Sequence, residues 1–227
     1  MVDEGIVKIN PVTQFRRRYI RQFKKKNPTA RQIISVQQFE NLVNATTETV
    51  YKCLILIMGL CGLRREETTS LNVGSFDFEN HIISIPSHPK RVEGIVFMPL
   101  IVEKVMLIYF NQRTEKLGRK LRPDEPAFIG IQAGTRIKGE RIRLKLQCLA
   151  EKLGFHNPGG KEYEKFYPHC LRHFFTTLLM ESGELSIEYV KELRGDVRSE
   201  LYGYYQIPIW RLYEKYLRCI PPLNIEL

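Results

Sequence analysis

Two short β-rich runs inside an otherwise helical pattern set the strongest limit on the fold of this chain. Residues 81–86 and 94–99 are rich in Ile and Val, and the polar segment 87–93 separates them. This pattern predicts a small antiparallel hairpin. Helical periodicity is expected on both sides of it, over 35–43, 48–60, 66–71, 100–119 and 137–153, with short helices and turns over 169–219. The expected fold class is mainly α with a small antiparallel β-sheet (α+β).

The positive charge of the chain is concentrated near its start. Lys and Arg number 35 against 25 Asp and Glu, so the formal net charge is +10 at pH 7. Residues 15–31 contain no acidic residue, and interleaved aromatic side chains favour a DNA-binding segment over a solvated tail. The basic residues proposed to bind DNA there are Arg16, Arg17, Arg18, Arg21, Lys24, Lys25 and Lys26. A second basic region, 113–145, suggests a clamp around a duplex.

Several other classes of protein are disfavoured by the sequence. No apolar run approaches the roughly 18 residues of a membrane span, and the first ten residues lack the apolar segment of a secretory signal. We therefore expect a cytoplasmic, nucleoid-associated protein with no membrane partner. The five cysteines form no CxxC pair and are expected to be core thiols. No metal site and no cofactor are predicted.

Four local features carry side chains suited to phosphate chemistry. They are, in chain order, Arg64 after a glycine turn, Lys90 and Arg91 in the hairpin connection, His169 and Arg172 on one helical face, and the adjacent Tyr204 and Tyr205. Each feature alone also fits a structural role. Together they form an ordered series.

In that order the residues resemble the tyrosine recombinase (integrase) family over nearly the whole chain. Residues 62–67 are similar to its G-L-R-x-x-E pattern, and residues 169–175 to its H-x-L-R-H-x-F box. Residues 192–196 resemble the form found in archaeal plasmid and virus integrases, which suggests a mobile element as the source. The resemblance implies that 32–227 is the catalytic domain. Residues 1–31 would be a basic linker or the remnant of an N-terminal DNA-binding domain.

The resemblance implies a site-specific recombinase that cleaves and rejoins DNA through a 3′-phosphotyrosyl intermediate without metal. Arg64 and Arg172 would stabilise the extra negative charge on phosphorus, because each guanidinium offers a planar fork of donors. Tyr205 would be the nucleophile, with His169 as its base or as a donor to the phosphate. Lys90 would protonate the departing 5′ oxygen.

Supporting roles are expected for two acidic residues, and two assignments stay open. Glu67 would orient the site. Asp196 stands where family members commonly carry a histidine or tryptophan, so the role of that histidine or tryptophan does not transfer to Asp196. Arg91 is the alternative to Lys90 because the register of the lysine strand is loose. Tyr204 is the alternative to Tyr205, since counting back from the C-terminal end favours it.

The expected partner is a double-stranded DNA attachment site. We expect the protein to form a homotetramer on this DNA and to be a monomer when free. Two other functions compete with this one. The first is a type IB topoisomerase-like enzyme that relaxes DNA with the same residues. The second is a catalytically decayed DNA-binding accessory protein, suggested by Asp196 and by the expected absence of a larger N-terminal domain.

Overall fold

The computed structural model describes residues 32–86, 94–130, 134–196 and 209–226. The basic tract, the hairpin connection with Lys90 and Arg91, and both Tyr204 and Tyr205 lie outside the described residues. Gln32–Leu227 forms one compact unit. In the described ranges, no helix combines the length and apolarity needed to cross a membrane.

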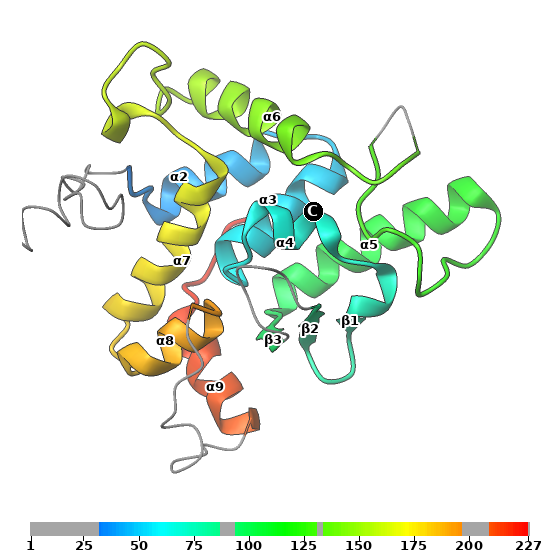
Figure 1. The fold of residues 1–227 in the computed structure, drawn as a ribbon. Coiled ribbons are helices and arrows are strands. Elements are labelled where there is room, and N and C mark those ends of the chain that lie inside the picture. The colour runs from blue at the N-terminus through cyan, green and yellow to red at the C-terminus, as the bar shows by residue number, and fades with distance from the viewer. Residues whose placement is uncertain (1–31, 87–93, 131–133, 197–208, 227) are drawn as a thin grey trace, which may run out of the picture. The chain divides into compact units, whose positions relative to one another are not determined.

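The described chain is mainly helical, with a small sheet at one edge (Figure 1), as the sequence predicted. The helices are α2 (Val36–Asn44), α3 (Thr49–Leu60), α4 (Arg65–Ser70), α5 (Leu100–Leu117), α6 (Gly139–Lys152), α7 (Pro168–Glu181), α8 (Ile187–Leu193) and α9 (Ile209–Cys219), with 3-10 turns η2 (Val73–Ser75) and η3 (Glu162–Glu164). The strands are β1 (Phe76–Asp77), β2 (Ile82–Ile85) and β3 (Gly94–Phe97). Helix α7 spans 14 residues, so part of the region expected to hold only short helices is one long element.

The sheet is antiparallel, with strand order β1-β2-β3. The predicted hairpin is confirmed by the pairing of β2 with β3, in which Ile83 lies opposite Val96. The pairing of β1 with β2 was not predicted. Two residues are too few to show an alternating pattern, so the sequence gives no signal for β1. The strand forms where the neighbouring edge of β2 offers it hydrogen bonds.

Helix α3 forms the centre of the main core. Its residues Cys53 to Leu60 are all buried, and the helix packs against α2, α5 and α7. A helix surrounded by other helices has no polar face, which explains the unbroken apolar run in the sequence. Before it, Ser35 caps α2, since its hydroxyl accepts from the Gln38 main-chain N–H at 3.1 Å.

A smaller core joins α7, α8, α9 and β3. Helix α9 buries Leu212, Tyr216 and Cys219, which lie on one face at helical spacing. The Tyr216 hydroxyl donates to the Leu60 carbonyl at the end of α3, at 2.7 Å. This bond fixes the C-terminal helix beside the turn that leads into α4.

Two predictions about side chains are wrong in part. Cys148 is exposed, while the other four cysteines are buried as expected. In the second basic region, Arg113 is 7% exposed and donates to the carbonyls of Pro126 and Ala127. Arg136 likewise donates to the carbonyl of Leu71. These arginines donate to main-chain carbonyls of the protein itself, so the region is not wholly a surface for DNA.

Gly62 provides a stability prediction with a matched control. Its φ is +71°, and a Cβ added there would lie 2.4 Å from the Phe175 ring, whereas Gly118 has φ +64° and open space around it. Gly118→Ala should cost about 1 kcal/mol of left-handed strain. Gly62→Ala adds steric overlap and should cost about 3 kcal/mol. Urea unfolding measures both, and equal losses would contradict the close approach of Phe175.

Candidate active site

The turn between α3 and α4 orients Arg64. The left-handed Gly62 ends α3 and lets the chain reverse, which leaves Arg64 at the N-cap of α4. The Glu67 carboxylate is 1% exposed and accepts from the Arg64 main-chain N–H and from its Nη1, both at 2.7 Å. A carboxylate in the first helical turn that reaches back to the N-cap is a favourable arrangement. Glu67 therefore holds the main chain and the guanidinium of Arg64 in place.

Arg172 lies on α7 and is buried, with 1% of its side chain exposed. Its Nη1 donates to the Gly62 carbonyl, and its Nη2 donates to the Arg194 carbonyl at 2.6 Å. Burial, together with the positive charge of Arg64, lowers the pKa of Arg172 to about 10. The guanidinium is still charged at neutral pH, so the site keeps a buried positive charge.

The end of α8 places Asp196 beside these arginines. Gly195 has φ +64°, and its N–H donates to the Glu192 carbonyl at 2.6 Å, while the Asp196 N–H donates to the Lys191 carbonyl at 3.0 Å. This pair of bonds is the Schellman motif, in which a left-handed glycine closes a helix. This turn directs Asp196 toward α7.

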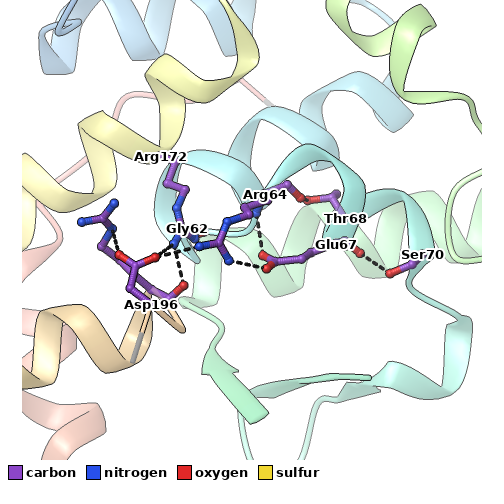
Figure 2. A network of polar contacts seen from close by, with 8 residues as sticks. Gly62, Arg64, Glu67, Thr68, Ser70, Arg172 and Asp196 are labelled. Atoms are coloured by element: carbon purple, nitrogen blue, oxygen red, sulfur yellow. Dashed lines mark hydrogen bonds and ion pairs between the residues drawn. The ribbon is translucent and has the colours of Figure 1, made fainter. Parts of the chain in front are cut away.

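The Asp196 carboxylate joins three arginines. Its Oδ1 accepts from Nη2 of Arg64 and from Nη2 of Arg172, each at 2.7 Å, as Figure 2 shows. Its Oδ2 lies 3.2 Å from Nε of Arg194. Residues from the α3–α4 turn, from α7 and from the end of α8 thus meet at one anionic group.

A cavity of about 350 Å³ lies against both arginines. It is lined by Leu63, Arg64, Arg65, Glu66, Glu67, Arg143, Tyr167, Pro168, His169 and Arg172. His169 stands at the start of α7, and its ring meets that of His173 edge-on at 4.7 Å. His169 and Arg172, which the sequence placed on one helical face, thus line the same cavity.

The structure brings together Arg64, Glu67, His169, Arg172 and Asp196, and it does not describe Lys90, Arg91, Tyr204 or Tyr205. Sequence reasoning missed the main-chain acceptors of Gly62 and Arg194. The glycine turns at 62 and 195 were a usable signal, because tight turns present carbonyl groups that need partners. In the described ranges, no group of three or more His, Cys, Asp or Glu side chains is placed to hold a metal ion.

Comparison with known proteins agrees with this fold. A sequence profile of the phage integrase family matches residues 32–205, so this chain belongs to the phage integrase family. Tyrosine recombinase XerC of Thermodesulfovibrio yellowstonii is 28% identical over 203 residues, which cover 86% of this chain and 62% of the relative. Tyrosine recombinase XerA of Saccharolobus solfataricus is 28% identical over 146 residues, covering 64% and 42%. The chain thus spans less than two thirds of the length of these relatives.

Solved structures show the same fold. A crystal structure of XerA recombinase superposes with a TM-score of 0.63 at 21% identity, covering 86% of this chain and 68% of that one. An integrase from mycobacterium phage Brujita gives 0.64 at 18% identity, covering 100% and 68%. The mainly helical arrangement with its small sheet is therefore that of tyrosine recombinase catalytic domains.

Proposed function

We propose that this chain is a site-specific DNA recombinase that cleaves and rejoins DNA through a 3′-phosphotyrosyl intermediate. One observation carries the proposal: Nη2 of Arg64 and Nη2 of Arg172 converge on a single oxygen at 2.7 Å. Two guanidinium groups aimed at one oxygen suit the non-bridging oxygens of a phosphodiester. They also suit the extra charge that these oxygens gain during transesterification.

The proposed reaction needs no external energy source. The Tyr205 oxygen attacks phosphorus while the bond to the 5′ oxygen breaks, so one phosphodiester replaces another. The phenol proton passes to His169, and Lys90 gives a proton to the departing 5′ oxygen. Arg64 and Arg172 supply the positive charge at phosphorus, and for this reason we propose a metal-independent reaction.

The proposed partner is a duplex attachment site. Structures of XerH bound to its difH substrate and of a lambda integrase dimer bound to a COC′ core site have this fold. By analogy we propose duplex DNA as substrate and a homotetramer on it. The resemblance of residues 192–196 to archaeal plasmid and virus integrases supports a mobile element of that type as the source of the chain. We propose that the protein acts on DNA in the cytoplasm.

The function is tested with a nicked suicide duplex that spans the attachment site, mapped first on the element that carries the gene. The expected product is a protein–DNA adduct that survives SDS and forms equally well in excess EDTA. Absence of an adduct would favour a decayed DNA-binding protein. Relaxation of plasmids that lack the attachment site would favour the topoisomerase, and loss of cleavage in EDTA would indicate a metal-dependent nuclease.

The role of Lys90 gives a separate prediction. Lys90→Ala should slow cleavage of ordinary DNA by about 100-fold, within the usual contribution of a general acid. A 5′-phosphorothiolate at the scissile bond should restore the rate, because its sulfur leaves without protonation. Single-turnover cleavage of both substrates measures this. Equal defects would remove Lys90 from the role and make Arg91 the next residue to test.

The basic tract gives a prediction about binding. Deleting residues 1–31 should flatten the plot of log K against log salt concentration, because each lost phosphate contact removes about 0.9 from the slope on duplex DNA. Fluorescence anisotropy with a labelled duplex at several salt concentrations measures the slope. An unchanged slope would show that the tract is a solvated tail, which would also contradict a DNA-binding linker.

A further inference from the structure

Asp196 occupies the point where the two arginines of the site converge. Its Oδ1 is the oxygen that both Nη2 groups reach at 2.7 Å. A carboxylate and a phosphodiester each present two oxygens that share one negative charge, and guanidinium forks bind both. We propose that the Asp196 carboxylate fills the phosphate site of the DNA-free protein and is exchanged for the scissile phosphate. This inference rests on the proposed function.

The exchange requires that the arginines keep their places without Asp196. Arg64 is also held by the buried Glu67, through its main-chain N–H and its Nη1. Arg172 is also held by the carbonyls of Gly62 and Arg194. Asp196 therefore adds to a geometry that other contacts already define, and its departure leaves two ordered donors behind.

Asp196 itself is in a position to leave. Its side chain is 27% exposed, whereas the side chains of Arg172 and Glu67 are each 1% exposed. It lies just beyond the end of α8, so a rotation about its own side-chain bonds is enough to break its contacts with the arginines. Glu67 lacks this freedom because its carboxylate is buried and bonded to the main chain of Arg64. Of these two acidic groups, Asp196 is the one that a phosphate can replace.

The site also has room and donors for an anion. The cavity of about 350 Å³ lies against Arg64 and Arg172. In the described part of the chain, the buried Nε of Arg172 has no hydrogen-bond partner. An unsatisfied buried donor on a charged group calls for an explanation, and an incoming phosphate provides a further acceptor at this guanidinium.

The exchange has a consequence for selectivity. A single phosphate has to displace a carboxylate that already holds the same donors, so its affinity is reduced. Attachment-site DNA brings many other contacts, and these supply the free energy of displacement. The other reading is that Asp196 only orients the arginines toward a phosphate bound elsewhere, in which case removing its charge weakens anion binding.

The two readings predict opposite signs for Asp196→Asn. Asp124→Asn is the matched control, because it makes the same change in charge on a 77% exposed side chain paired with Arg122 at 3.5 Å. Isothermal titration of the full chain with inorganic phosphate gives the dissociation constants. We expect Asp196→Asn to bind phosphate about 10-fold more tightly than wild type, the size of one charge-assisted hydrogen bond. Asp124→Asn should stay within about twofold, and Asp196→Glu should keep the weak binding of wild type.

Binding by Asp196→Asn that is no tighter than binding by Asp124→Asn would overturn the inference, since a purely structural side chain does not tighten anion binding when it is removed. If Asp196→Asn shows no cooperative melting, Asp196→Ser makes the same comparison. The suicide-duplex assay separates this inference from the proposed function. An adduct in wild type without a gain in Asp196→Asn defeats the inference alone, and a gain without any adduct defeats the proposed function alone.

Discussion

Tyr205→Phe should abolish the covalent DNA adduct while binding of the duplex is retained. Phenylalanine keeps the ring and lacks the oxygen that attacks phosphorus, so no phosphotyrosyl bond can form. Tyr205 follows Asp196 by nine residues, the interval on which the assignment rests. Asp196, from which the residues are counted, lies 2.7 Å from Arg64 and from Arg172, the two arginines proposed to act at phosphorus.

Tyr204→Phe is the matched control for this prediction, since it removes the same oxygen one residue earlier and should keep the adduct. Neighbouring side chains on a helix point about 100° apart. Two adjacent tyrosines on the same helix would therefore not both face one phosphate. Trapping on a nicked duplex, followed by peptide mapping, identifies the modified residue. DNA attached to Tyr204 would overturn the assignment.

Much of the fold follows from hydrophobic periodicity. The pattern at 48–60 predicted a helix, and α3 is buried along nearly all of its length. The two β-rich runs predicted the hairpin, and β2 pairs with β3 as expected. These features are local: a run of side chains determines which faces must be covered. Strand β1 and the exposure of Cys148 depend instead on which distant elements pack there, and a local pattern contains no such information.

The site shows the same division between local and distant information. Arg64, Glu67, His169 and Arg172 could be chosen from short motifs because their spacing along the chain is fixed. The contact of Asp196 with both arginines could not be predicted, since it needs the α3–α4 turn, α7 and the end of α8 to come together. The sequence marked Asp196 as a departure from the family pattern. Only the structure shows that this acidic group is bonded to both Arg64 and Arg172.

Arg172 and Arg64 differ in burial, and this difference predicts different effects of the same substitution. Arg172→Lys keeps the charge but loses the fork, so the carbonyls of Gly62 and Arg194 lose charge-assisted bonds at a position only 1% exposed. We expect a loss of about 2 to 4 kcal/mol in unfolding free energy. Cleavage should also fall by about 100-fold or more, as when one preorganised donor is removed from an active site.

Arg64→Lys is the matched comparison, because it makes the same change on a side chain that is 21% exposed. The Arg64 guanidinium bonds to the carboxylates of Glu67 and Asp196, which a lysine ammonium can still approach, and the Arg64 main-chain bond to Glu67 is unaffected. Cleavage should fall as far as in Arg172→Lys, with a clearly smaller loss of stability. Urea unfolding and single-turnover cleavage measure the two effects separately. Equal losses of stability would show that Arg172 does not join α7 to the turns that carry the Gly62 and Arg194 carbonyls. Unchanged cleavage in either variant would remove that arginine from the transition state, because only an interaction made there changes the rate of the chemical step.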